Sequence, residues 1–240
     1  MTINYFGPAG KAIDDQVKKD LIALNKIDLV TTWPDTQKYP PFVAFLRANH
    51  TRFEKIIIYI SEMNYGWEMR DQIIDSLKDI PNMYICDPVE RGDKDWRQVA
   101  TLECLKISKA DFVWFIEQDF FMTKHFVDNL IENVNNFEVI GFRDSNRLHP
   151  ACLVVSREVI DKTGRDFSAD PPTFDHFAMF TAQAEANGKT ITLDELDLKE
   201  NRDWYHFAGL SHNHNLEQQG KEANHKPDEF RLYKFISEWI

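Results

Sequence analysis

The first half of the chain alternates between short apolar segments and longer segments with helical periodicity. Four apolar segments have the length and the β-branched or aromatic content typical of buried strands, and a helical pattern follows each one. These segments are "IDLVTTW" (27–33), "KIIIYISE" (55–62), "NMYICDP" (82–88) and "DFVWFI" (111–116). The alternation predicts an α/β fold in which a mostly parallel sheet carries helices on both faces.

The second half has a less regular pattern. Two strands are expected at "EVIGFRDS" (138–145) and "HPACLVVS" (149–156), a helix before Gly188, and a further strand at "TITLDEL" (190–196). The segment 204–226 is rich in His and Asn and is expected to be a loop. Because the chain shows neither internal repeats nor a clear linker, we predict a single domain over residues 1–240 with an irregular C-terminal segment.

Charge and cysteine content exclude several classes of protein. The net charge of −11 argues against broad, nonspecific binding to nucleic acid or anionic lipid. Cys86, Cys104 and Cys152 are odd in number and widely spaced, so we expect buried free thiols in a reducing compartment. The sequence shows neither a signal-peptide pattern nor an apolar run of membrane-spanning length. These features predict a cytoplasmic protein without a membrane span.

Two carboxylates directly follow the fourth predicted strand. Glu117 and Asp119, separated by Gln118, come immediately after the apolar run 113–116. Ligands of open parallel sheets bind beyond the carboxyl ends of the strands. If the backbone stays extended, residues two apart point to the same side, so both carboxylates can reach one Mg²⁺ or Mn²⁺ ion. Alternatively, the two acids simply end a strand near the N-terminus of the next helix, where negative charge is favourable.

The run "SKADFVWFIEQD" (108–119) resembles the strand and DxD-type motif of GT-A fold glycosyltransferases, especially the family 2-like group. The resemblance implies a GT-A-like (Rossmann-like) sheet and a nucleotide-diphosphate sugar donor, linked to UDP or GDP. It also implies Mn²⁺ or Mg²⁺ as cofactor, bound by Asp119 and by Glu117, or a contact of Glu117 with the ribose. Gln118 would lie among the nucleotide contacts. Residues 27–120 would form the nucleotide-binding half, and 121–240 the acceptor half with a C-terminal loop.

Further nucleotide contacts follow from the same resemblance. Thr31, Thr32 and Trp33 end the first strand, where the family contacts the base. Glu62 ends the second strand, and Arg97 opens the helix before the acidic motif. Alternatively, Thr31, Thr32 and Trp33 simply end a strand, and Arg97 is a solvent-exposed residue of its helix. The family's usual Arg-Asn pair and Gly are replaced in that helix by "LEC" (102–104), so the nucleotide base stays open.

A catalytic base and an anion contact are expected in the second half. The family places its base at the start of a helix comparable to the one before Gly188, which points to Asp175 in an inverting transfer. His176 and Asp170 are the substitutes, and an acid that merely favours a helix N-terminus is the alternative. Arg143, in a predicted strand–turn–strand that also holds His149, can bind the diphosphate or an acidic acceptor, or else face solvent.

A late histidine is the third expected metal ligand. His206, His212 and His214 are the candidates, and His212 matches the family position best. Imidazole suits Mn²⁺ as well as zinc. An independent zinc site and solvated loop histidines are the alternatives.

The resulting hypothesis is a metal-dependent glycosyltransferase that acts on an acceptor hydroxyl. The acceptor stays open among a glycan, a protein, a small molecule and a modified DNA base. A sugar-phosphate nucleotidyltransferase is a second hypothesis, although "TTWPDTQKYPP" (31–41) lacks the Gly-rich, basic loop of those enzymes. A noncatalytic module that binds a nucleotide sugar is the third.

Overall fold

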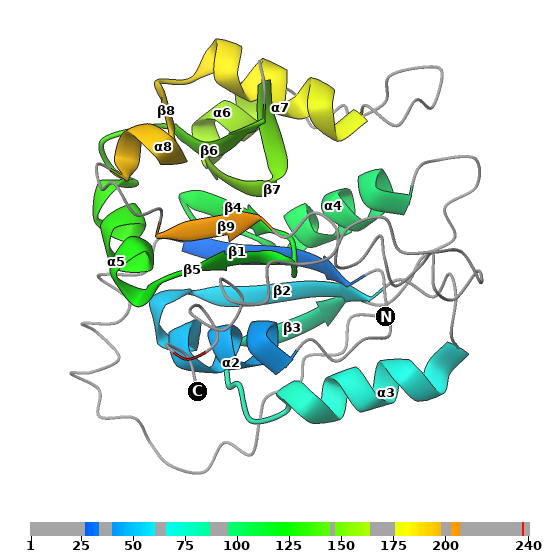
Figure 1. Cartoon of the computed structure of the whole chain (residues 1–240). Helices are drawn as coiled ribbons and strands as arrows, with labels where there is room; N and C mark the ends of the chain where they lie inside the picture. Colours follow the sequence, from blue (N-terminus) through cyan, green and yellow to red (C-terminus); the bar gives the residue numbers. More distant parts are fainter. Residues whose placement is uncertain are drawn as a thin grey trace, which may run out of the picture.

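The computed structural model describes residues 27–33, 40–60, 66–86, 96–144, 147–163, 176–197, 203–206 and 237 (Figure 1). Seven strands of this part of the chain form one sheet in the order β3-β2-β1-β4-β7-β6-β8. Their bounds are β1 Ile27–Trp33, β2 Lys55–Ile60, β3 Met83–Cys86, β4 Phe112–Ile116, β6 Val139–Asp144, β7 Arg147–Ser156 and β8 Thr190–Thr192. A second, two-stranded sheet pairs β5 (Phe120–Met122) with β9 (Trp204–His206).

The direction of the strands confirms the mostly parallel sheet. β1 pairs in parallel with both β2 and β4, and β2 pairs in parallel with β3. β7 runs antiparallel to its two neighbours, β4 and β6, while β6 and β8 are parallel. The carboxyl ends of β1, β2, β4 and β6 therefore lie at one edge of the sheet, together with the beginning of β7.

Helices cover both faces of the sheet, as predicted. One hydrophobic core lies against α2 (Pro40–Asn49), α3 (Gly66–Leu77), α5 (Lys124–Asn133) and α8 (Leu193–Leu196). The other lies against α4 (Trp96–Ile107), α6 (Arg157–Lys162) and α7 (His176–Asn187). A short 3-10 helix, η1 (His50–Arg52), follows α2. The alternation of the strands divides their side chains between the two cores: Leu29 of β1 enters the first and Val30 the second.

Two helix starts show how local sequence fixes the elements around the site. The Thr123 side chain accepts a hydrogen bond from the Phe126 backbone N–H and caps α5. By contrast, the strand predicted for 190–196 ends after three residues. Thr192 and Glu195 form a capping box there and start α8, because each side chain bonds the other's backbone N–H.

The loop predicted from residue 204 is also different at its start, because residues 204–206 form β9. Three residues give too short a pattern to identify a strand, and the partner strand β5 lies far away in the sequence.

The three cysteines are buried free thiols, as expected. Burial raises the pKa of Cys104, and a hydrogen bond with Cys86, 3.8 Å away between the sulfur atoms, raises it further. Burial likewise raises the pKa of Cys152. Cys104 and Cys152 therefore stay protonated, and all three cysteines serve as packing groups.

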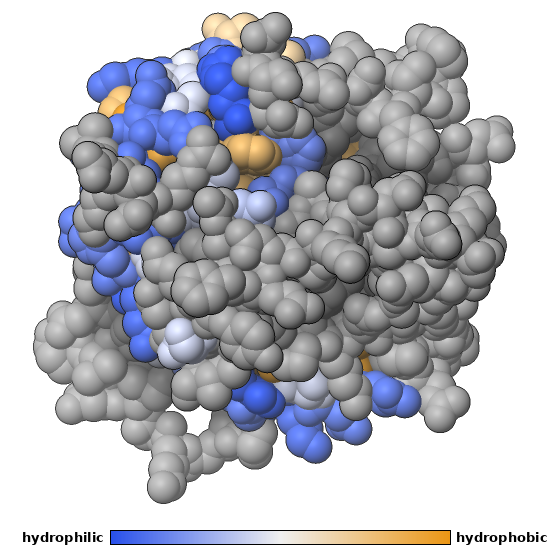
Figure 2. Space-filling model, viewed as in Figure 1, coloured by the Kyte–Doolittle hydropathy of each residue, from blue (hydrophilic) through white to orange (hydrophobic). Residues whose placement is uncertain are grey.

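The surface of the described residues is mainly polar on the face shown in Figure 2, where orange, hydrophobic residues occur in small separate places. In the part of the chain that the structure describes, every helix is too short or too polar to cross a bilayer.

Candidate metal centre

A tight turn places the two predicted carboxylates beyond the carboxyl end of β4. The strand ends at Ile116, and the Phe120 N–H donates to the Glu117 carbonyl at 3.1 Å, which closes a turn with Gln118 and Asp119 at its centre. The expectation that an extended backbone aligns Glu117 with Asp119 was therefore wrong. The carboxylates converge because the chain turns back, while the Glu117 N–H stays anchored to the Ala151 carbonyl of β7 at 2.9 Å.

The pairing of β5 with β9 brings a histidine to these acids. β5 begins directly after Asp119, and its first residue, Phe120, lies opposite His206 in the antiparallel register. The two rings stack with their centroids 5.8 Å apart. A further hydrogen bond, from the Thr123 N–H to the Asp203 carbonyl at 2.8 Å, continues the pairing beyond the strand ends. His206 is thus held in register with the turn.

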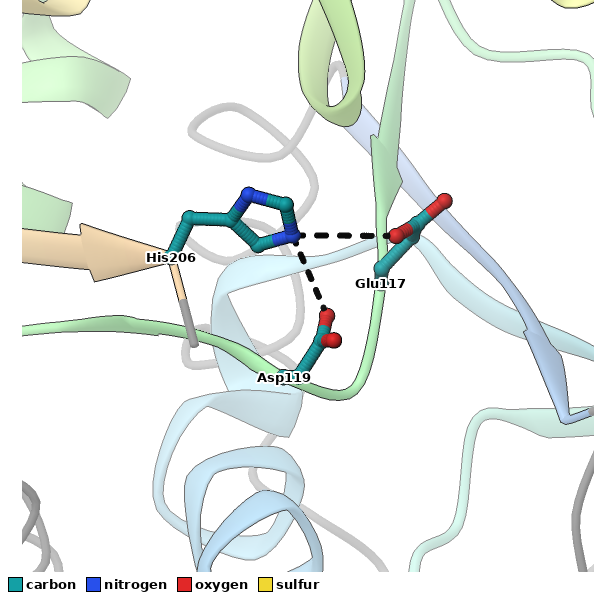
Figure 3. A group of neighbouring side chains, drawn as sticks. All are labelled: Glu117, Asp119 and His206. Carbon is teal, nitrogen blue, oxygen red and sulfur yellow. Dashed lines mark ion pairs between the residues drawn. The ribbon is translucent and has the colours of Figure 1, made fainter. Parts of the chain in front are cut away.

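Glu117, Asp119 and His206 point toward one another (Figure 3). His206 Nε2 lies 3.5 Å from Asp119 Oδ1 and 3.9 Å from Glu117 Oε2. One ligand atom from each residue lies within 4.8 Å of the other two. Oxygen ligands at about 2.1 Å around an octahedral ion lie roughly 3.0 Å apart when adjacent and 4.2 Å when opposite. The two distances from His206 Nε2 to the carboxylate oxygens fall in this range, so the three side chains can hold one divalent cation.

Burial differs between the two acids in a way that suits such a centre. The Asp119 side chain is 6% exposed, whereas the Glu117 side chain is 32% exposed. Asp119 is thereby held in place by its surroundings, while Glu117 faces outward enough to meet a bound molecule. Two carboxylates and one imidazole form a mainly hard ligand set, which favours Mg²⁺ or Mn²⁺.

Aromatic rings form the wall behind His206. Phe142 of β6 contacts the His206 ring at 5.5 Å and the Trp204 ring at 5.2 Å between centroids. Trp204 is 2% exposed and stacks on Phe120 at 5.5 Å. Trp204 is therefore a core-packing residue.

Gln118 links the turn to the end of β1. Its side chain is buried, and Nε2 donates to the Thr32 carbonyl at 2.5 Å. The backbone pairing of β1 with β4 ends at Val30 and Phe115. Beyond this point, the hydrogen bond from the Gln118 side chain links the two segments. Thr31 is buried and Thr32 is partly exposed, and Trp33 ends the strand. The predicted nucleotide-contacting strand end therefore lies beside the turn that carries Glu117 and Asp119.

Arg143 lies on the other face of the sheet from His206. Phe142, the preceding residue of β6, contacts the His206 ring, and successive strand residues point to opposite faces. Arg143 forms an ion pair with Glu185 of α7. A contact of Arg143 with the diphosphate stays a prediction.

The remaining predicted residues are only partly described. Arg97 is the second residue of α4, and His176 is the first residue of α7. Five of the candidate residues lie outside the described part of the chain: Glu62, Asp170, Asp175, His212 and His214. The metal-ligand role predicted for His212 is therefore untested, and the histidine that the structure brings to the acids is His206. The one sequence signal for it was its membership of the late histidine cluster.

Comparisons with known proteins identify the fold. No protein-family model and no curated protein matches the chain. The structure of TarS 1–349 from S. aureus is similar at 12% identity, with 89% of this chain and 70% of that chain covered and a TM-score of 0.52. Glucosyl-3-phosphoglycerate synthase from Mycobacterium tuberculosis, in complex with Mn²⁺, UDP-glucose and phosphoglyceric acid, is similar at 12% identity. That match covers 91% of this chain and 88% of that chain, with a TM-score of 0.50. The chain therefore has the GT-A-type fold predicted from its sequence.

Replacement of Gln118 tests its structural role. Gln118→Leu keeps the size of the side chain but removes the donor, which leaves the buried side of the Thr32 carbonyl unsatisfied. We predict a loss of about 1–3 kcal/mol in the free energy of unfolding, measured by urea denaturation. The control Gln72→Leu, at an exposed position of α3, should change stability by less than about 0.5 kcal/mol. Equal urea midpoints for Gln118→Leu and the unmodified protein would contradict this role.

Proposed function

We propose that the protein is a metal-dependent glycosyltransferase that transfers a sugar from a UDP- or GDP-linked donor to an acceptor hydroxyl with inversion. The observation that carries the proposal is the convergence of Glu117, Asp119 and His206 at the carboxyl edge of a GT-A-type sheet. In open α/β sheets this edge is where ligands bind. The glucosyl-3-phosphoglycerate synthase of the same fold was solved with Mn²⁺ and UDP-glucose, which is the same donor chemistry.

The three proposed ligands differ in burial and therefore in role. His206 lies against the aromatic wall, and both His206 and Asp119 are largely buried, so they hold a fixed place for the cation. Glu117 is more exposed and can bind the same cation or a ribose hydroxyl. A bound Mn²⁺ or Mg²⁺ would neutralise charge on the diphosphate leaving group.

The donor is proposed to lie over residues 27–120. Trp33, at the end of β1, pairs with Ile60 of β2 in the parallel register, directly after Thr31 and Thr32. Glu62 follows Ile60 by two residues in the sequence, and Arg97 lies in the first turn of α4. Together they are proposed to contact the base and phosphates, while 121–240 supplies the acceptor side.

Asp175 is the proposed catalytic base. It directly precedes His176, the first residue of α7, in the sequence. A carboxylate in this position would take the proton from the acceptor hydroxyl as that oxygen attacks the anomeric carbon. The Arg143–Glu185 ion pair ties α7 to β6 and so fixes the helix that follows the base. His176 and Asp170 are the substitutes.

Removal of the buried carboxylate tests the metal centre. Asp119→Asn keeps the side-chain size but weakens a ligand, so we predict at least a tenfold loss in Mn²⁺ affinity, measured by electron paramagnetic resonance. Stabilisation by UDP-glucose or GDP-mannose with Mn²⁺, read as a shift in melting temperature, should fall with it. Glu132→Gln, an exposed acid on α5, is the matched control. Unchanged Mn²⁺ binding in Asp119→Asn would refute the assignment, and pyrophosphate release from a nucleoside triphosphate and a sugar phosphate would identify a nucleotidyltransferase instead.

A pair of histidine variants decides which late histidine is the ligand. His206→Gln should weaken Mn²⁺ binding about tenfold or more, because it removes the nitrogen that faces both acids. His212→Gln should leave Mn²⁺ affinity within about threefold of the unmodified protein. The reverse pattern would assign the role to His212, as the family resemblance alone suggests.

Replacement of the proposed base separates chemistry from binding. Asp175→Asn should lower kcat for sugar transfer by about 10²–10⁴-fold, while the Mn²⁺-dependent binding of the donor persists. His176→Asn should keep most of kcat. If His176→Asn instead loses the activity and Asp175→Asn retains it, the histidine is the base. Proton NMR coupling constants of the product anomer would test inversion directly.

A further inference from the structure

His149 lies at an irregular point of β7, next to the metal centre. On β6, the neighbouring residues Gly141 and Phe142 pair with Leu153 and His149, respectively. Residues 150–152 of β7 therefore form a bulge between these two pairs. Bulges occur often beside active sites, where they direct side chains and backbone groups toward the site.

One hydrogen-bonded path leads from His149 to Glu117. The Ala151 N–H donates to His149 Nδ1 at 3.1 Å, so the imidazole closes the bulge over two residues. The Ala151 carbonyl accepts the Glu117 N–H at 2.9 Å. The Ala151 backbone thus donates to the His149 side chain and accepts from Glu117, which carries one of the proposed metal-binding carboxylates.

A second path leads from His149 to His206 through ring contact. The centroids of the two imidazoles are 5.2 Å apart, with an interplanar angle of 45°. Phe142 contacts both rings, at 5.6 Å from His149 and 5.5 Å from His206. The His206 ring is therefore confined by His149 and Phe142 on the β6–β7 side and by Phe120 on its own strand pair.

The hydrogen bond to Ala151 also shows why His149 is a poor metal ligand. Its Nδ1 lone pair is occupied by the Ala151 N–H, so the neutral ring carries its proton on Nε2. Among the described residues, the side chains whose ligand atoms cluster within 4.8 Å of one another are Glu117, Asp119 and His206. His149 borders this set without joining it.

We propose that His149 is a positioning residue of the metal centre, which fixes Glu117 through the Ala151 backbone and His206 through ring contact. This inference rests on the proposed function, because it takes Glu117, Asp119 and His206 as the ligands of a cation. Residues around metal ligands commonly contribute about 10–100-fold to metal affinity. His149 contributes through two ligands at once.

Three substitutions separate the two paths. His149→Ala removes both. His149→Asn places Oδ1 near the former position of Nδ1. There the oxygen can accept a hydrogen bond from the Ala151 N–H, as in an Asx-turn, but the side chain lacks the imidazole ring. His149→Phe keeps a ring beside His206 but removes the acceptor. His125→Ala, at an exposed position of α5, is the control.

The readout is the affinity of the full-length chain for Mn²⁺ alone, measured by electron paramagnetic resonance, with the melting temperature of each variant measured in parallel. We expect His149→Ala to weaken Mn²⁺ binding about tenfold. At least one of His149→Asn and His149→Phe should recover part of this affinity, and His125→Ala should bind as the unmodified protein does. A variant that does not fold is excluded by its melting curve, and the other two variants still decide the question.

Three results would overturn the proposal. Unchanged affinity in His149→Ala would show that neither path matters. Complete loss of Mn²⁺ binding in all three variants would show that His149 is itself a metal ligand. Absence of Mn²⁺ binding by the unmodified protein would remove the centre itself, and with it the proposed function, whereas the first two results leave that function intact.

Discussion

The antiparallel pairing of β5 with β9 is the interaction on which the candidate metal centre depends. β5 is only three residues long and begins directly after Asp119, and β9 ends with His206. Their register places Phe120 opposite His206, which brings the imidazole to the acids. Such a short pair has little stability of its own. Its aromatic side chains, Phe120 and Trp204, anchor it in the first hydrophobic core.

The turn that carries the acids is held from both sides. Toward the proposed donor half, Gln118 bonds the carbonyl of Thr32 at the end of β1. Toward the proposed acceptor half, the Glu117 N–H bonds the carbonyl of Ala151 in the bulge of β7. The turn is therefore fixed against the two strands that flank β4, and its geometry should respond to a molecule bound on either side.

Convergence of two carboxylates has an electrostatic cost that limits what the site can do without a counter-charge. Asp119 is nearly buried, and Glu117 lies within ligand distance of the same point. Like charges at this range disfavour each other, and burial removes the water that would screen them. A divalent cation offsets this cost, which is a physical reason to regard the cluster as a cation site.

The sequence by itself determined most of the sheet and located two of the three residues of the candidate centre. Apolar runs at 27–33, 55–60, 83–86 and 112–116 identified the four parallel strands, because buried strands need continuous apolar side chains. The same reasoning located Glu117 and Asp119 at the carboxyl edge.

Only the tertiary structure decided which histidine meets the acids and how. The choice of His206 follows from a three-residue strand pair between segments far apart in the sequence, and the position of His149 follows from a bulge fixed by the pairing of β6 with β7. Neither leaves a periodic signal, because periodicity reports which face of an element is buried and not which element lies beside it. The convergence of the two carboxylates was likewise decided by tertiary structure. A backbone hydrogen bond from Phe120 to Glu117, set by the packing around it, closes a turn in place of the extended geometry that the apolar run suggested.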